Sequence, residues 1–308
     1  MSSSNPPPVP RIPPNPPALH VGCAMWTHRA WSRRLLPAQA ASGPGDRLRA
    51  YASWCTAVEG NTTFYATPSR DTVRAWAEQT DPAFRFVLKL PRTITHERRF
   101  VGVEAPLREF LDVIEPLGPR AHALWIQLPA SFTPAAVPAL ATFVRGLPRS
   151  RRYAVEVRHP AFFTDQGASA ALERVLVSAG AEWVPFDTTA FFARPPTSAA
   201  ERDAWEKKPR VPARTRALTS APIVRYLGRD DPEATVAGWA RWVEAAAGWL
   251  REGRSPTVFI HTPDNVDAPV LARRFHDAVR ARVPDLPPLP APLRPPPTPP
   301  APAPLTLF

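Results

Sequence analysis

The sequence has little cysteine and no long apolar run. Cys23 and Cys55 are its two cysteines in 308 residues. They form no Cys-x-x-Cys pair and have no metal-binding spacing, so a reducing cytosol is the expected compartment. The N-terminus has no cationic and apolar signal segment, and no apolar run reaches the roughly 18 residues of a membrane span. We therefore expect a cytoplasmic protein that has no membrane partner.

Charge and aromatic residues are scarce at both ends of the chain, where proline is abundant. Residues 1–18 and 284–308 hold 20 of the 43 prolines and only three charged residues. Such segments bury too little apolar surface to offset the entropy of ordering. We expect two disordered, proline-rich tails, partly polyproline II, around one domain at 19–283. The alternative is that a tail serves as a ligand for an aromatic-grooved partner.

The net charge is +11, and nearly all of it lies between the tails. A basic surface suits polyanions or phosphorylated ligands. Most of the basic residues are arginines scattered along the expected helices, and the densest run contains Arg149, Arg151 and Arg152. Scattered arginines are more typical of ordinary solvent-exposed helix faces, so nucleic acid is kept only as the alternative partner.

Eight apolar segments of strand length alternate with eight segments of helical periodicity. The expected strands lie near 19–23, 57–61, 84–89, 121–127, 152–158, 182–186, 223–227 and 257–261. The expected helices lie near 46–54, 69–79, 105–115, 135–145, 167–179, 199–207, 233–251 and 268–282.

Strands that alternate with helices indicate a parallel sheet, because parallel neighbours need crossover connections. Eight strand–helix units in about 250 residues are the number found in a closed (β/α)₈ TIM barrel. The competing fold is an open doubly wound sheet, but no glycine-rich phosphate loop follows the first strand. The sequence therefore predicts an α/β protein with a single TIM barrel.

Almost every expected strand ends in a polar side chain. A barrel gathers the carboxyl ends of its strands around one cleft. These ends supply Glu59, Asn61, Lys89, Gln127, Glu156, Arg158, Asp187, Arg225 and His261, and the loops beyond add Trp26, Tyr65, His96 and His159. The strand starts are less polar, although His20, Arg85, His122 and Glu182 lie there.

The carboxylates Glu59, Glu156 and Asp187 are the catalytic candidates. Two carboxyls whose environments separate their pKa values can act as acid and base, and nearby cations would separate them. The alternative for Glu59 and Glu156 is a salt-bridged network that only satisfies buried charge. A divalent metal on these carboxylates and His261 is also conceivable, but the nearby cations oppose it, so we predict no metal or cofactor.

The cations Lys89, Arg158 and Arg225 are candidates to bind an anion. Arginine suits bidentate recognition of a carboxylate or phosphate, and pairing with acidic neighbours is the alternative. Lys89 could instead form a Schiff base if it is desolvated, although pairing with Glu59 would keep it protonated.

The remaining candidates would shape the ligand site. His96 and His159 are proton-transfer candidates by residue type, with hydrogen bonding inside their loops as the alternative. Trp26 and Tyr65 could form a wall against a ligand the size of a sugar or base, although most aromatic residues will be core. The carboxamides of Asn61 and Gln127 would bind polar groups of the ligand; these two are expected beside the charges.

Four segments and one arginine, taken in their order along the chain, are similar to the sequence pattern of one protein family. They are Val58-Glu59-Gly60-Asn61-Thr62-Thr63-Phe64-Tyr65, Ile94-Thr95-His96, Trp125-Ile126-Gln127-Leu128-Pro129, Tyr153-Ala154-Val155-Glu156-Val157-Arg158-His159-Pro160 and Arg225. Over residues 19–283 the chain resembles the YecE-like family, catalogued as domain of unknown function 72. The resemblance implies a TIM barrel with a polar pocket at its C-terminal face, and it supplies no reaction.

The chain departs from the family pattern at three places. The family usually has Gly-Trp-x-Tyr after the first strand, where Met25 and His28 stand here at the glycine and tyrosine positions. Leu227 stands where the family often has a histidine after the seventh-strand arginine, and His261–Asn265 stands where a pair of asparagines is common. These changes suggest a variant ligand, or a histidine moved from the seventh strand to the eighth.

The sequence thus supports two functional hypotheses. The first is an enzyme of unassigned reaction that binds a small phosphorylated or polyhydroxylated anion at the carboxyl ends of the strands. The second is a non-catalytic basic module that binds nucleic acid or another polyanion through its outer arginines.

Overall fold

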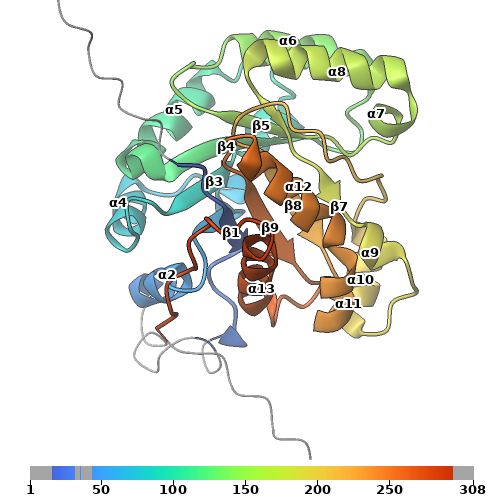
Figure 1. Ribbon diagram of the computed structural model, residues 1–308. Coiled ribbons are helices and arrows are strands. Elements are labelled where there is room, and N and C mark those ends of the chain that lie inside the picture. The colour runs from blue at the N-terminus through green and yellow to red at the C-terminus, as the bar shows by residue number, and fades with distance from the viewer. Residues whose placement is uncertain (1–15, 32–34, 36–43, 294–308) are drawn as a thin grey trace, which may run out of the picture.

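Nine short parallel strands form one curled sheet in the computed structural model, which describes residues 16–31, 35 and 44–293 (Figure 1). The order across the sheet is β6-β5-β4-β3-β2-β1-β9-β8-β7. The strands are β1 His20–Cys23, β2 Ala57–Gly60, β3 Arg85–Lys89, β4 Ala121–Gln127, β5 Tyr153–Glu156, β6 Glu182–Trp183, β7 Phe186–Asp187, β8 Ile223–Leu227 and β9 Thr257–His261. The prediction of an α/β protein with a parallel sheet is confirmed.

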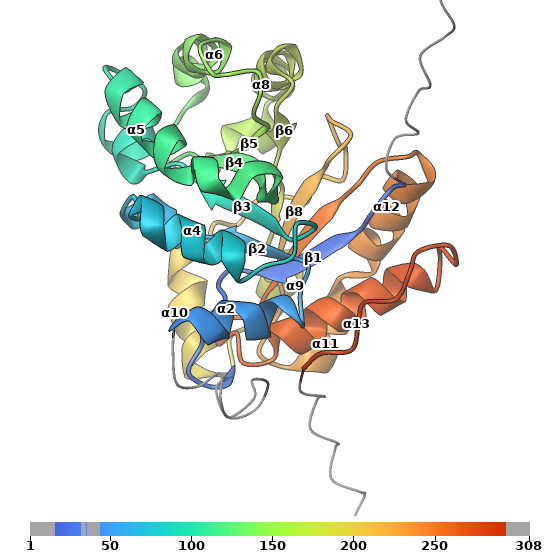
Figure 2. The same cartoon turned by 90° about the vertical axis from the view of Figure 1, so that its left-hand side faces the viewer.

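Helices follow the strands and cover the outer side of the sheet (Figures 1 and 2). The α-helices are α2 Pro44–Ala52, α3 Thr62–Tyr65, α4 Arg70–Glu78, α5 Glu104–Ile114, α6 Val137–Arg145, α7 Ala161–Thr164, α8 Gln166–Ala179, α9 Thr189–Phe192, α10 Ala199–Lys207, α11 Pro232–Gly238, α12 Ala240–Arg251 and α13 Ala268–Arg280. Shorter turns are the π-helical η2 Thr93–Glu97 and the 3₁₀ segments η3 Glu115–Arg120 and η4 Pro134–Ala136.

Polar side chains fix where several helices begin. Ser69 accepts a hydrogen bond from the Thr72 N–H, and Asp165 caps α8 in the same way. Such caps satisfy backbone donors that have no partner inside the helix. Gly180 ends α8 with φ 64°, a left-handed conformation that glycine adopts without strain.

Two predicted elements are divided. The sixth strand, predicted at 182–186, is split into β6 and β7, because Pro185 has no N–H to donate to a neighbouring strand. The helix predicted at 233–251 is split into α11 and α12. At the end of α11 a Cβ on Gly238 would lie 2.4 Å from the Tyr226 hydroxyl, so the helix touches β8 before the chain turns at Trp239.

The curvature of the sheet is visible in its packing. Trp125 of β4 stacks on Phe259 of β9, with ring centroids 6.2 Å apart, although three strands separate β4 from β9 in the sheet. These two rings belong to a separate buried cluster of side chains from the strands and the segment between β6 and β7. The larger core cluster lies between the strands and the helices.

Residues 284–293 lie against the folded chain. Leu286 is buried, Arg273 donates a hydrogen bond to the Pro290 carbonyl at 2.7 Å, and the Leu293 N–H donates to Ser53 Oγ at 3.1 Å. This stretch contrasts with the prediction of a disordered tail from 284 onward. Residues 1–15 and 294–308, the rest of both predicted tails, lie outside the described residues. Within the part of the chain that is described, no helix has the length and apolar character to cross a membrane.

Candidate functional site

Charged and polar side chains from six strands meet at the carboxyl edge of the sheet. We call this group the carboxyl-edge cluster: Glu59, Lys89, Gln127, Glu156, Arg158, Arg225 and His261. Four of them, Lys89, Gln127, Glu156 and His261, are the last residues of their strands, and Glu59 is the last but one of β2. Arg225 is the middle residue of β8, and Arg158 follows β5 by two residues. The sequence prediction that these residues come together is consistent with this geometry.

Glu59 is the centre of the cluster and is fully buried. Its Oε1 lies 2.8 Å from Lys89 Nζ, and its Oε2 lies 2.9 Å from His261 Nε2 and 3.2 Å from Arg225 Nε. Burial alone would raise the pKa of Glu59, but Arg225 and Lys89 hold it well below its ordinary value. Glu59 is therefore ionised and can only accept hydrogen bonds. His261 Nε2 also lies 3.2 Å from Arg225 Nε, so the tautomer of His261 decides whether Nε2 donates to Glu59 or accepts from Arg225.

Glu156 is also fully buried. Glu156 Oε2 and Glu59 Oε1 both lack a hydrogen bond, but Glu59 Oε1 has the Lys89 ammonium group at 2.8 Å. Arg158 Nε donates to Oε1 at 2.6 Å, whereas Oε2 lies 3.9 Å from Arg225 Nη1 and has no hydrogen-bond donor among the described residues. Burial favours a higher pKa for Glu156, but Arg158 and Arg225 lower it below its ordinary value. A buried carboxylate oxygen without a donor is costly, and a ligand hydroxyl would satisfy it.

Lys89 is held on several sides. Besides Glu59, its Nζ donates to Gln127 Oε1 at 2.7 Å and lies 5.0 Å from the centre of the Trp125 ring. Burial lowers the pKa of Lys89 to about 8, and Glu59 opposes that change. These contacts explain why Gln127 belongs to the cluster: its carboxamide orients the ammonium group.

The two arginines lie over aromatic rings and close the cluster. The Arg225 guanidinium lies 4.3 Å from the centre of the Phe186 ring, and that of Arg158 lies 5.8 Å from the same ring. The Arg158 side chain is 22% exposed and that of Arg225 is 7% exposed. Arg158 is therefore on the solvent side of the cluster, where a ligand would arrive.

Burial and Arg225 lower the pKa of His261 to about 4, so His261 adds no positive charge at neutral pH.

Lys208 belongs to the surroundings of the cluster and was missed by the sequence analysis. It follows α10 in the connection between β7 and β8 and is half-buried. Burial, Arg225 and Arg158 lower its pKa to about 8, while Glu59 and Glu156 act in the opposite direction. The search for polar strand ends could not find it, because it lies 21 residues after Asp187, the end of β7.

Two of the predicted strand-end residues are occupied elsewhere. Asp187 accepts from Trp242 Nε1 at 2.6 Å and from the Thr189 N–H at 2.8 Å, so both carboxylate oxygens hold the protein together. The strand with Glu59 ends at Gly60, and Asn61 has helical φ and ψ. The prediction that this strand extends to Asn61 is therefore wrong by one residue; the Asn61 amide donates to the Ala24 carbonyl at 2.8 Å.

The two loop histidines make hydrogen bonds within their own loops. His96 Nδ1 lies 2.8 Å from Thr95 Oγ1, and its ring packs edge-on to Phe64 at 4.9 Å. Burial and the charge of Arg158 lower the pKa of His96 to about 4, so His96 is neutral at neutral pH. His159 Nδ1 accepts from the Ala161 N–H at 3.2 Å, at the start of α7.

Tyr65 and Trp26, the two residues predicted to form an aromatic wall, differ in solvent exposure. Tyr65 is 72% exposed and packs edge-on to Phe64 at 5.2 Å. Trp26 is half-buried and packs on Trp76 at 5.1 Å, at the margin of the core. Tyr65 therefore remains a candidate for contact with a ligand, whereas Trp26 has a structural contact already.

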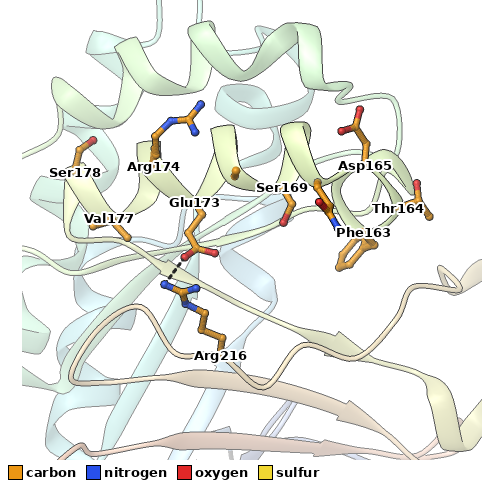
Figure 3. Close-up of a pocket in the computed structure, with 11 residues that line it drawn as sticks. Phe163, Thr164, Asp165, Ser169, Glu173, Arg174, Val177, Ser178 and Arg216 are labelled. Atoms are coloured by element: carbon orange, nitrogen blue, oxygen red, sulfur yellow. Dashed lines mark ion pairs between the residues drawn. The ribbon is translucent and has the colours of Figure 1, made fainter.

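A separate hollow of about 590 Å³ lies along α8 (Figure 3). Its wall includes Phe163, Asp165 and Glu173, and Arg216 pairs with Glu173 at 2.8 Å across it. It contains none of the predicted site residues. The described residues also contain no group of three or more His, Cys, Asp or Glu side chains placed to hold a metal ion.

The fold and the cluster define a class: an α/β protein with a curled parallel sheet and an ionic site at the carboxyl ends of its strands. Residues 20–296 match the family model described as "Protein of unknown function DUF72", and the chain belongs to this family. The chain is 36% identical over 273 residues to the UPF0759 protein YecE of Escherichia coli, both in strain K12 and in O157:H7. Each match covers 89% of this chain and 97% of the relative.

Solved structures of the family have the same fold. A DUF72 family protein from Thermotoga maritima MSB8 has a TM-score of 0.64 at 20% identity, covering 85% of this chain and 99% of that one. A DUF72 family protein from Enterococcus faecalis V583 has a TM-score of 0.62 at 18% identity, covering 85% of this chain and 95% of that one. The family resemblance read from the sequence is thus confirmed.

Proposed function

We propose that the curled sheet is a TIM barrel of eight strands, in which β6 and β7 are two halves of one strand. The segments are separated only by Val184 and Pro185; β6 pairs with β5, and β7 pairs with β8. The Val184 N–H donates to the Val155 carbonyl, and the Pro185 carbonyl accepts from the Arg225 N–H. One hydrogen bond to each neighbouring strand is thus kept between the halves, although Pro185 donates none. A barrel would turn the carboxyl-edge cluster into a central cleft.

We propose further that the cluster binds a small anionic ligand as the active site of an enzyme. The observation that carries this proposal is its charge. Among the described residues, the three cations Lys89, Arg158 and Arg225 lie within 4 Å of only two carboxylates, Glu59 and Glu156. An excess of buried or half-buried cations favours a ligand that brings negative charge.

The site also favours a ligand that carries hydroxyl groups. Glu156 Oε2 lacks a donor and could accept a hydrogen bond from a ligand hydroxyl, while Arg158 and Arg225 bind the anionic group beside it. Because Glu156 is ionised, it is suited to accept a proton and not to donate one. A phosphorylated, hydroxylated compound meets both requirements.

The proposal is tested by calorimetry of the full chain with inorganic phosphate and with pyrophosphate. Replacing Arg158 by Gln should weaken binding about tenfold or more, since a charge-assisted hydrogen bond contributes about 1.5–3 kcal/mol. The matched control is Arg282→Gln, which removes an arginine that pairs with Glu244 on the surface. Equal affinities of both variants and the parent chain would contradict an anion site at the cluster.

The alternative is a basic module that binds nucleic acid through Arg149, Arg151 and Arg152. Arg149 and Arg152 are exposed, and all three lie in the loop that enters β5, at the opposite edge of the sheet from the cluster. This hypothesis predicts binding to single-stranded DNA that weakens steeply with salt. If Arg151→Gln and Arg152→Gln abolish that binding while Arg158→Gln has no effect on either ligand, the alternative replaces the anion site.

A further inference from the structure

A cavity of about 750 Å³ lies at the amino edge of the sheet, where the strands begin. We call it the amino-edge cavity. Its wall includes residues that lead into three neighbouring strands, namely Leu19 before β1, Cys55 and Thr56 before β2, and Phe84 before β3. No residue of the carboxyl-edge cluster lines it. Its volume falls in the range of roughly 300–1,000 Å³ that is typical of small-molecule sites.

The remaining wall comes from α13 and from two segments near the ends of the described chain. Residues 16–18 and 285–291 line the cavity together with Arg273 and His276 of α13. The second segment turns back and runs along α13 (Figure 2). Arg273 Nη2 holds it there by donating to the Pro290 carbonyl at 2.7 Å. The cavity is therefore bounded by a segment that hydrogen bonds tie to a helix.

Most of the wall is apolar. Besides several prolines and alanines, it includes Trp54, Phe84 and Leu286, all three of which are buried. Protein interiors are close-packed, and apolar side chains that face an empty space lose their packing contacts on that side. A ligand with an apolar body would restore these contacts.

Arg273 brings a positive charge to this wall without a counter-charge. Its two terminal nitrogens donate to the main-chain carbonyls of Ser53, Trp54, Leu289 and Pro290. Carbonyl oxygens satisfy donors but do not neutralise a charge, and Arg273 has no ion pair with any residue of the described ranges. Its Nε–H also has no acceptor among those residues. One donor of a half-buried guanidinium is thus left for a ligand.

His276 supplies a second polar group on the same face of α13, three residues after Arg273. Its side chain is 2% exposed, and its Nδ1 has no hydrogen-bond partner in the described part of the chain. The nearest carboxylate oxygen, Asp277 Oδ1, lies 4.0 Å away. Burial lowers the pKa of His276 to about 4, so the ring is neutral at pH 7 and has one donor nitrogen. A buried imidazole without a partner is costly, and a ligand acceptor would remove that cost.

The acidic residues of the wall do not cancel the charge of Arg273. Asp81 and Asp285 line the cavity, but both are exposed, so water and salt screen their charges. Asp81 Oδ1 also accepts a hydrogen bond from the Ala83 N–H at 2.7 Å. The cavity thus combines an apolar body with one half-buried cation.

We propose that the amino-edge cavity binds a small amphipathic monocarboxylic acid. Its hydrocarbon body lies against Trp54, Phe84 and Leu286, and its carboxylate accepts hydrogen bonds from Arg273 and His276. A single guanidinium with most of its donors occupied matches one negative charge, whereas a phosphate would bring a second charge that nothing in this wall offsets. This inference does not rest on the proposed anion site at the other edge of the sheet.

The test is calorimetry of the full chain with octanoate and with octanol, which has the same hydrocarbon body but no charge. Octanoate should bind at one site and about tenfold more tightly than octanol, because only the acid makes a charge-assisted hydrogen bond. Equal affinities would contradict recognition of the carboxylate. Absence of binding by both compounds would mean that the cavity is closed in solution, and would overturn the site.

The variants compare two adjacent arginines of α13. Arg273→Gln should weaken octanoate binding about tenfold or more and leave octanol binding unchanged. The matched control is Arg274→Gln, which removes an arginine that pairs with Glu233 at 2.8 Å on the surface and should change neither affinity. If Arg273→Gln weakens both compounds equally, Arg273 only holds the segment at 285–291 in place, and the carboxylate contact is wrong.

A second variant tests the same contact without loosening that segment. His276→Leu leaves no unpaired polar group in the wall, and it should weaken octanoate about threefold or more while octanol binds as before. An unchanged preference for octanoate in both the Arg273 and the His276 variants would overturn the inference.

Inorganic phosphate locates the acid. Saturating phosphate should leave the affinity for octanoate unchanged, because the two compounds bind at opposite edges of the sheet. If phosphate competes with octanoate and Arg273→Gln has no effect, the acid binds at the carboxyl-edge cluster. In that case the amino-edge site is wrong and the anion site stands.

Discussion

The two edges of the sheet hold buried carboxylates in opposite ways. At the carboxyl edge, Glu59 is surrounded by the charges of Lys89 and Arg225, and its pKa is well below the ordinary value. At the amino edge, Glu182 has no ion pair with a described residue and accepts hydrogen bonds from the backbone N–H groups of residues 218–219 and from the Thr219 hydroxyl. Burial raises the pKa of Glu182, and these hydrogen bonds only reduce that change.

The two edges differ in whether the groups that contact the buried carboxylate are also free to contact a ligand. Backbone dipoles around Glu182 belong to a fixed turn and fasten the end of the connection between β7 and β8 to β6. Side-chain cations around Glu59 and Glu156 exceed the carboxylates, so a ligand can take a share of them. Both edges contain a buried carboxylate, but among the described residues only the carboxylates of the carboxyl edge are paired with cationic side chains.

Glu59→Gln should give the largest effect on stability. The substitution leaves Lys89 and Arg225 buried without their counter-charge, and removing one partner of a buried pair costs about 3–5 kcal/mol. Urea unfolding measures this loss. The control is Glu244→Gln, which breaks the surface pair with Arg282 and should cost roughly 0–1 kcal/mol. Similar losses in the two variants would mean that the cluster is not electrostatically coupled.

Glu182→Gln should have a smaller effect. The amide retains one acceptor oxygen but places an NH₂ group against donors of residues 218–219, and leaving such groups unsatisfied costs about 1–3 kcal/mol. No cation is left without a partner, so phosphate binding at the other edge should not change. Calorimetry and urea unfolding on the same sample check both statements. A loss as large as that of Glu59→Gln would remove the distinction between charges and dipoles.

The strand ends could be predicted because two general rules agree at those positions. Apolar segments ending in Glu59, Lys89, Glu156 and Arg225 are typical of parallel strands whose carboxyl ends meet, and the structure brings these four together. Asp187 also lies at the end of an apolar strand segment. Its partner, however, is Trp242, 55 residues later in the sequence, and nothing in the local pattern indicates that contact.

Lys208 could not be found in this way, because its position depends on the path of a connection and not on a periodic element. Thr188 and Arg210 anchor that path through contacts with Pro209 and with aromatic rings, which no spacing rule predicts. The break of the sixth strand at Pro185 could be predicted more readily from the sequence, since proline has no N–H for hydrogen bonding between strands. The predicted strand 57–61 was one residue too long, because β2 ends at Gly60 and Asn61 has helical φ and ψ.

His122→Gln should reveal the smallest of the three effects, and only in acid. The rings of His20 and His122 lie 5.7 Å apart at the amino edge. Burial, His20 and Arg152 lower the pKa of His122 to about 3; burial and Arg85 lower that of His20 to about 4. The unfolded chain, with histidine pKa values near 6.5, therefore binds more protons than the folded chain below that pH.

The free energy of unfolding therefore falls as the pH is lowered from about 6.5 toward 4, because the unfolded chain binds more protons in that range. His122→Gln removes one such group, so the loss between pH 7 and pH 5 should shrink by about 1–2 kcal/mol. Urea unfolding at both pH values measures the change. If the variant loses as much stability as the parent, His122 is protonated in the folded protein. A protonated histidine would then be buried at the amino edge beside Arg85 and Arg152, and the contrast between the two edges would narrow.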